Sequence, residues 1–313
     1  MSVLSSPLLD PPQWTAALAP FLRSTLGFDA LPEVVHLTVY ACAASFAVQA
    51  LSRVVSPRLF GRFYTSLRRT KQDDWDLHMV GWLFSIVATP LAFFVLRWPS
   101  AELVQEPIRG IATSEARLAA MGTGYFLWDA LSTLRHFRTQ GLGFALHGCG
   151  CFCAAIFTFK PFLLGNVGRF LIWEFSTIFL NAHWLLDKLN LTGSRLQLIN
   201  GLFLISAFVG ARLLYGTYSS FLVWRLLLPS AGDSSKAAIA ARETPHWIRV
   251  LYLGLNLLMN GLNFYWFRLM VLALRKRFVA SPSPASAEAK KAVPDNVQNG
   301  QLGEAAEKRA KRE

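Results

Sequence analysis

The stretch RFLIWEFSTIFLNAHWLLDK (Arg169–Lys188) is mostly apolar and about 20 residues long, the length at which a helix crosses the hydrocarbon core of a bilayer. It nevertheless contains Glu174 and Asn181, and a carboxylate at the centre of a membrane helix costs about 2.5–3.5 kcal/mol on insertion scales. At about 100° per residue, Glu174, Thr177, Asn181 and Lys188 fall within one narrow arc of the helix. We therefore predict a membrane helix whose single polar stripe faces the interior of a helix bundle or a wet cavity, and not lipid.

The composition of the whole chain agrees with a membrane protein. Hydrophobic residues make up 53% of the sequence and charged residues only 16%, whereas soluble domains carry about 25% charge. The net charge of +12 raises the question of nucleic-acid binding. However, the basic residues lie between apolar segments and in the C-terminal tail, and they form no stripe interleaved with aromatics. We therefore exclude nucleic acid as a partner and assign these charges to membrane surfaces.

The fold class predicted from hydropathy is all-α: a multi-pass membrane bundle of about seven transmembrane helices. The expected spans lie near 33–54, 78–98, 117–134, 142–160, 166–187, 198–226 and 248–274. Residues 1–32 form a lumenal N-terminal segment in which we expect an interfacial helix, and 33–71 hold the first span with a basic cytoplasmic loop. A larger membrane domain covers 72–275. Residues 276–313, rich in Pro, Ala and charge, are predicted to be a disordered basic cytoplasmic tail.

Orientation follows from the basic residues of the short loops. The loops after the first and third spans and the end of the last span are rich in Arg and Lys, and all three lie on one side. This predicts a lumenal N-terminus, a cytoplasmic C-terminus and residence in the endoplasmic reticulum or a connected endomembrane. The sequon Asn190-Leu191-Thr192 then falls in a cytoplasmic loop and should remain unmodified.

Several ionisable side chains lie within the predicted spans. The third span carries Tyr125 and Asp129 on one face, the fourth carries His147, and the sixth carries Arg212 near mid-membrane. Arg212 needs a buried partner, for which Asp129 or Glu174 is available. Ionisable side chains that cluster within one small membrane bundle mark a substrate or ligand site more often than they serve no function. An imidazole oriented by a carboxylate would also make a general base or nucleophile, if the third and fourth spans are neighbours.

Uncharged polar residues admit a plainer interpretation. Asn256, Asn260 and Asn263 form a ladder on the seventh span, and we interpret it, like Thr177, chiefly as hydrogen bonding between helices. The four cysteines are Cys42, Cys149, Cys151 and Cys153. Because Cys151 points away from its two neighbours on a helix, we interpret the cysteines as small packing residues. We predict no metal site and no cofactor.

Four motifs resemble one family. They occur in order as DDWDLHMVGWLFS (Asp73–Ser85), GYFLWDALSTL (Gly124–Leu134), ALHGCGCF (Ala145–Phe152) and the opening stretch. Together they resemble the TLC domain, which is shared by ceramide synthases, a translocation-associated membrane protein and several small lipid-related proteins. The resemblance covers roughly 72–275, and the Glu-Ser-Thr…Asn pattern of the fifth span looks like the small TLC-domain-containing branch.

The chain departs from the ceramide synthases at the positions tied to acyl transfer. Their paired His-His reads His147-Gly148 here, and their His-Asp…Asp pattern in the fifth span is absent. In the opening motif, Asp76 and His78 stand for an Asn and an Arg, while Gly81 and Phe84 stand for a Ser and a His. The resemblance therefore implies lipid homeostasis without one established reaction.

Three hypotheses follow. In the first, the protein binds a lipid or acyl chain within the bundle, with membrane lipids as partners and Tyr125, Glu174, Thr177, Asn181 and Arg212 lining the site. In the second, it is an acyl-CoA-dependent acyltransferase in which His147 is the base or acyl acceptor and Asp129 orients it. In the third, it is a non-enzymatic membrane chaperone or trafficking adaptor that docks through its tail.

Overall fold

The computed structural model describes residues 9–279, and side-chain surroundings through Arg275. This part of the chain is helical and contains no strand. Two units divide the chain, Met1–Phe264 and Tyr265–Glu313, and the site described below belongs entirely to the first. The segment predicted as an interfacial helix holds α1 (Gln13–Pro20) and the π-helical η1 (Phe21–Thr25). The predicted tail falls almost wholly outside the described residues.

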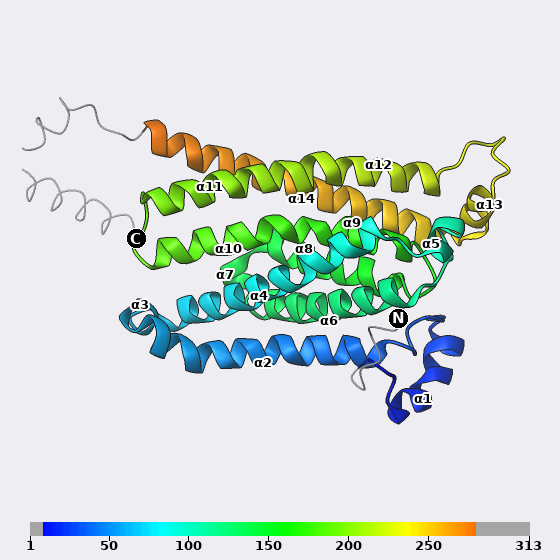
Figure 1. Cartoon of the computed structure of the whole chain (residues 1–313), viewed down its shortest axis with the longest axis horizontal. Coiled ribbons are helices and arrows are strands. Elements are labelled where there is room, and N and C mark those ends of the chain that lie inside the picture. Colours follow the sequence, from blue (N-terminus) through cyan, green and yellow to red (C-terminus); the bar gives the residue numbers. More distant parts are fainter. Residues whose placement is uncertain (1–8, 280–313) are drawn as a thin grey trace, which may run out of the picture. The chain divides into compact units, whose positions relative to one another are not determined.

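Helices occupy all seven predicted spans (Figure 1). Four of the segments are long and apolar enough to cross a membrane: α2, α4, the continuous run Arg195–Leu227, and α14. The helices of the spans are α2 (Val35–Phe60), α4 (Arg69–Arg97), α6 (Thr113–Arg135), α8 (Leu142–Phe157), α9 (Val167–Leu171) with η3 (Ile172–Glu174) and α10 (Phe175–Lys188), α11 (Arg195–Ala207) with η4 (Phe208–Leu214) and α12 (Tyr215–Leu227), and α14 (His246–Val279). Short helices connect them: α3 (Arg62–Thr65), α5 (Ala101–Gln105), α7 (Phe137–Gln140), η2 (Leu164–Asn166) and α13 (Lys236–Glu243).

The outward faces of the long helices are apolar. Phe93 and Phe94 on α4 are 51% and 54% exposed, and Leu202 and Phe203 on α11 are 61% and 57% exposed. A water-soluble protein rarely leaves such contiguous apolar surface uncovered, whereas lipid solvates it without cost. The protein is therefore embedded in a membrane.

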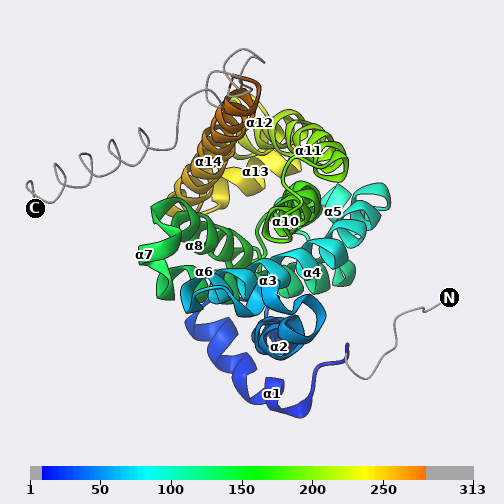
Figure 2. The same cartoon turned by 90° about the vertical axis from the view of Figure 1, so that its left-hand side faces the viewer.

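Helix α6 packs against α2, α8, α4 and α9, and α10 packs against α4 and α11 (Figure 2). Close approach at α6 depends on glycine. A Cβ on Gly124 would lie 2.2 Å from the backbone oxygen of Thr38 and 2.8 Å from the Cβ of Ala41. Small residues at helix crossings are the usual means by which membrane helices bring their backbones together. Gly124 of the GYF motif thus serves the packing of α6 against α2.

The fifth and sixth spans are not uniform α-helices. The fifth is interrupted by the 3₁₀ turn η3, and the sixth by the π-helical η4, and these two irregular segments pack against each other. Such segments free backbone groups from the regular ladder and are frequent at functional sites. They position the polar site at the level where both spans are irregular.

Candidate functional site

The polar groups of the fifth and sixth spans converge on the guanidinium of Arg212, whose side chain is 7% exposed. Nη2 lies 3.5 Å from Glu174 Oε1 and donates to Thr177 Oγ1 at 3.0 Å. Nη1 donates to Asn263 Oδ1 at 3.1 Å, and Nε donates to Ser176 Oγ at 2.9 Å. The acidic partner of Arg212 is therefore Glu174 and not Asp129. An equally buried carboxylate beside the guanidinium is the arrangement that a charge within a membrane bundle requires.

The irregular helices explain how this cluster is assembled. Glu174 ends the 3₁₀ turn η3, directly before α10 begins at Phe175. Arg212 lies within the π-helical η4, and its Nε also donates to the backbone oxygen of Trp173 at 3.1 Å. A side chain that bonds to an interrupted backbone compensates for the ladder hydrogen bonds lost there. The cluster and the two helix irregularities are thus one structural unit.

Asn181 is buried, as Glu174 is and as the predicted inward-facing stripe requires, but it does not join the Arg212 cluster. Its Oδ1 is 2.7 Å from Nδ1 of His78 on α4, and the His78 ring stacks on Trp184 at 4.0 Å between centroids. Four residues advance a helix by about 6 Å, so Asn181 lies one turn beyond Thr177 and meets α4 instead of η4. The sequence alone gave no signal that His78 would be its partner.

Tyr125 lies near Asn181 and is also within electrostatic range of Glu174 and Arg212. A Cβ on Gly81 would be 3.4 Å from the Tyr125 hydroxyl and 3.6 Å from Asn181 Nδ2, so Gly81 leaves room for both. The Tyr125 ring stacks on Phe84 at 3.6 Å between centroids. Within the described residues, Asn181 Nδ2 is buried and has no hydrogen-bond partner. The predicted site therefore divides into an Arg212 cluster and an Asn181 cluster. Lys188, the last residue of the expected stripe, pairs instead with Asp187 at 3.6 Å.

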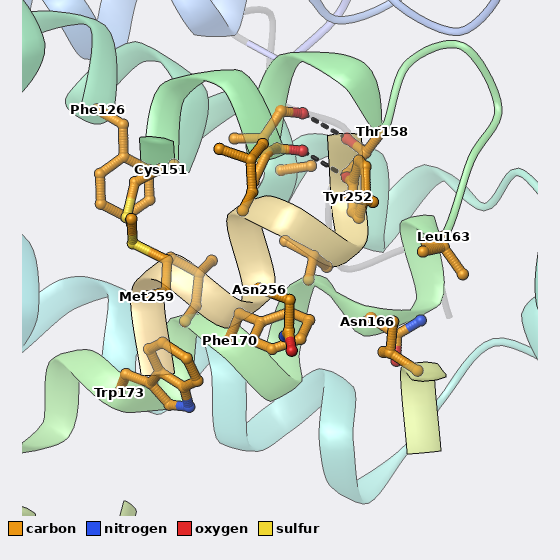
Figure 3. A pocket seen from close by; sticks show the side chains of 18 of the residues that line it. Phe126, Cys151, Thr158, Leu163, Asn166, Phe170, Trp173, Tyr252, Asn256 and Met259 are labelled. Carbon is orange, nitrogen blue, oxygen red and sulfur yellow. Dashed lines mark hydrogen bonds between the residues drawn. The ribbon is translucent and has the colours of Figure 1, made fainter. Parts of the chain in front are cut away.

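Figure 3 shows side chains that line an internal cavity of about 110 Å³. This cavity adjoins the Arg212 cluster, because Glu174 lines it. Its walls come from α6, α8, α9, η3, α12 and α14 and are largely apolar, with Phe126, Phe170 and Met259 among them. The polar side chains that reach it include Glu174 and His147. A pocket lined mainly by apolar side chains, with a few polar groups that orient the ligand, is the usual form of a binding site for a largely apolar ligand.

Cys151 packs against the apolar core, as the interpretation of the cysteines as packing residues requires, and it also lines this cavity. Its Sγ lies 3.7 Å from Nδ1 of His147, one helical turn away on α8, and 3.7 Å from the Met259 sulfur. Both His147 and Cys151 line the cavity. The i, i+4 spacing of the two residues was the available signal, because it places them on one face of a helix.

Asp129 lies against α8, beside the position where ceramide synthases carry their second histidine. A Cβ on Gly148 would be 2.8 Å from Asp129 Oδ2 and 3.1 Å from both N and Cα of Ala130. Helices α6 and α8 are thus neighbours, as the pairing of Asp129 with His147 required. Because position 148 faces the backbone of α6, a histidine there would need the two helices to separate.

Asp76, one of the altered residues of the opening motif, is the centre of a second buried polar network. The Asp76 carboxylate is fully buried and accepts hydrogen bonds from Ser52 Oγ at 2.7 Å, Arg53 Nε at 2.9 Å and the Tyr64 hydroxyl at 3.2 Å. Burial and the neighbouring Asp76 raise the pKa of Tyr64 to about 12. Arg53 supplies the countercharge that Asp76 needs in place of the family's neutral Asn. This network ties α2 to α4.

The Asn ladder divides between two roles. Asn256 accepts from Trp224 Nε1 at 3.0 Å, and Asn260 Nδ2 donates to Ser220 Oγ at 2.8 Å. These bonds join α12 to α14, as the interpretation of interhelical hydrogen bonding required. Asn263, by contrast, accepts from Arg212 and belongs to the candidate site.

Comparison with known proteins gives this geometry its context. Residues 74–272 match the family model described as the TLC domain, close to the 72–275 expected from the motifs. A TLC domain-containing protein of Schizosaccharomyces pombe is 30% identical over 85% of this chain and 88% of its own length. The topoisomerase I damage affected protein 4 of Saccharomyces cerevisiae is 28% identical over 82% of this chain and 88% of its own length. TLC domain-containing protein 4-B of Xenopus laevis is 27% identical over 56% of this chain and 70% of its own length.

Proposed function

This chain belongs to the TLC-domain family, and we propose that it binds the acyl chain of a membrane lipid inside its helix bundle and thereby acts in membrane lipid homeostasis. The observation that carries the proposal is the apolar cavity bordered by His147 and Glu174. The Glu174–Arg212 pair provides polar groups at its edge for the head of the lipid. Thr177 would support the head group indirectly, because it accepts a hydrogen bond from Arg212. Tyr125 and Asn181, which do not line this cavity, would contact the part of the lipid that extends beyond it.

The size of the cavity limits what it holds. An engineered apolar cavity of about 150 Å³ binds benzene, so a cavity of about 110 Å³ takes a section of an acyl chain and not a whole lipid. The remainder of the lipid would extend out of the bundle between helices. Apolar walls suit this ligand because an acyl chain has no polar group that needs a hydrogen bond. Since lipid already solvates the chain, the gain on binding comes from close van der Waals packing in the cavity.

Filling the cavity tests the proposal. Ala155 lines it on α8 and is only partly exposed, so Ala155→Phe should occupy the space of the chain. Ala47→Phe on α2 is the matched control, because Ala47 is exposed on the outer surface. Purified protein should carry lipid detectable by mass spectrometry in the wild type and the control but not in Ala155→Phe. Equal lipid in all three proteins, each monodisperse by size exclusion, would contradict the proposal.

Acyl transfer is a second candidate, favoured by the position of His147 beside Cys151 in the cavity wall. In this reaction a ring nitrogen of His147 would attack the thioester carbonyl of acyl-CoA, and the coenzyme A thiol would leave. Asp129, next to α8, would orient the imidazole. Gly148 in place of a second histidine weighs against a ceramide synthase mechanism.

Intact mass spectrometry distinguishes the two candidates. Incubation with a long-chain acyl-CoA should add one acyl mass and release coenzyme A if the protein is an acyltransferase, and His147→Ala should abolish both. Cys151→Ser is the control, because it alters the neighbouring cavity wall and keeps the imidazole. Lipid bound without acylation or coenzyme A release would favour the binding protein.

We further propose residence in the endoplasmic reticulum or a connected endomembrane, with a lumenal N-terminus and a cytoplasmic C-terminus. The basic loops support this orientation. The adaptor hypothesis depends on the tail, most of which lies outside the described residues. Deletion of residues 280–313 should leave lipid binding intact, and a loss of function that spares lipid binding would favour the adaptor.

A further inference from the structure

A second cavity, of about 440 Å³, is lined by residues of α2, of the start of α4 and of the end of α6, on the side of the basic loops. It is separate from the internal cavity, and the two share no lining residue. Its character is different as well, because charged side chains form much of its wall. The residues that matter for its chemistry are Arg53, Arg69, Arg135, Asp73, Phe46 and Leu131.

The positive charge of this cavity exceeds the negative charge nearby. Arg53 is occupied by two carboxylates, at 2.6 Å from Asp73 and 2.9 Å from Asp76. Arg69 lies 3.8 Å from Asp73, which Arg53 already engages, and its side chain is 66% exposed. Arg135 forms no ion pair within the described part of the chain. The cavity therefore presents arginine donors that no carboxylate of this bundle satisfies.

Apolar surface borders the same cavity. Phe46 on α2 is 44% exposed and Leu131 on α6 is 48% exposed, and both line it. Helix α2, which carries Phe46, is one of the four segments apolar enough to cross the membrane, and Leu131 belongs to α6, which packs against α2. The cavity therefore has exposed apolar side chains beside its arginines. A ligand that satisfies both parts of the wall must carry an anionic group directly attached to a hydrocarbon chain. A water-soluble phosphate would satisfy the arginines only.

We propose that this cavity binds the phosphate headgroup of an anionic phospholipid, with its acyl chains against Phe46 and Leu131. Arg135 and Arg69 would donate to the phosphate oxygens, as the planar guanidinium fork suits them. Basic pockets between membrane helices are a recurrent form of headgroup site. This site is independent of the acyl-chain cavity and does not require the function proposed above.

The test uses the full-length protein in phosphatidylcholine nanodiscs into which phosphatidic acid is titrated, with bound lipid counted by native mass spectrometry. Arg135→Gln should weaken phosphatidic acid binding about fivefold, which corresponds to roughly 1 kcal/mol per basic residue near the membrane surface. Arg69→Gln should act similarly. Arg138→Gln is the matched control, because Arg138 follows closely in the chain but does not line the cavity. It should change the affinity less than twofold, and Ala155→Phe should leave it unchanged.

Three results would overturn the proposal. Equal weakening by Arg138→Gln and Arg135→Gln would show that only the general surface charge attracts the lipid. Occupancy by phosphatidylcholine equal to that by phosphatidic acid would show that the headgroup charge is not recognised. Displacement of the lipid by soluble glycerol phosphate at matched concentration would show that the site binds free phosphates without its apolar wall.

Discussion

Replacing Arg212 by Met should strongly destabilise the bundle, because the guanidinium holds Glu174 at 3.5 Å in a place almost closed to solvent. The substitution keeps much of the side-chain volume and removes the charge. Glu174 would then be a buried carboxylate without a countercharge, and Asn263 and Thr177 would lose their donor. The effect should therefore be electrostatic and not a consequence of a new void.

The magnitude follows from the geometry. Two unit charges 3.5 Å apart attract each other by about 5 kcal/mol at an effective dielectric constant of about 20. Much of this attraction offsets the free energy that it costs to remove both charged groups from water. A single substitution at Arg212 removes the attraction but leaves the Glu174 carboxylate buried away from water. Breaking a buried pair in this way costs about 3–5 kcal/mol. Replacing both partners, as in Arg212→Met with Glu174→Leu, should cost much less than the sum of the single changes.

Equilibrium unfolding in mixed dodecyl sulfate micelles, followed by tryptophan fluorescence, measures these costs. Arg225→Met is the matched control, because Arg225 is exposed on α12, and it should change the free energy of unfolding by less than about 0.5 kcal/mol. A loss below about 1 kcal/mol for Arg212→Met, or additive effects in the double variant, would refute the assignment of a tightly coupled buried pair.

Three further expectations concern other parts of the fold. Gly148→His should cost about 3 kcal/mol through overpacking against α6, whereas Gly143→His on the same helix, where a Cβ meets nothing within 4 Å, should be tolerated; equal stability of the two variants would show that position 148 has room. Asn181→Leu should cost about 1–3 kcal/mol in the same unfolding assay because it removes the partner of His78, and an unchanged midpoint would mean that this bond contributes nothing. Asn190 should carry no glycan in cells, so glycosidase treatment should not shift the protein on a gel; a shift would reverse the proposed orientation.

Hydropathy predicted the positions of the helices because lipid favours helical segments of about 20 apolar residues, and four of the described segments meet that length and apolarity. The pairing of Arg212 with a carboxylate was foreseeable for a similar reason, since an unpaired charge at that depth is too costly. The choice of Glu174 over Asp129 was not foreseeable. It depends on the 3₁₀ turn η3 and the π-helical η4, which periodicity at 100° per residue cannot represent.

The same limitation explains the divided stripe. An ideal helix places Thr177 and Asn181 on one face, and they do follow each other along α10. Their partners differ because η4 reaches one turn of that face and α4 reaches the next. Which neighbouring helix reaches which turn depends on how α4 and η4 pack against α10. The packing of helices against one another is tertiary structure, and the periodicity of a single sequence does not predict it.

The most direct test of an acyl chain inside the bundle is photo-crosslinking with a phospholipid that carries a diazirine near the end of one chain. Peptide mass spectrometry then identifies the residues that the chain touched. Binding in the cavity predicts adducts on Phe170 and Met259, which line it, and their loss in Ala155→Phe. Adducts confined to exposed residues such as Phe93 and Leu202, and unchanged in Ala155→Phe, would contradict the proposal.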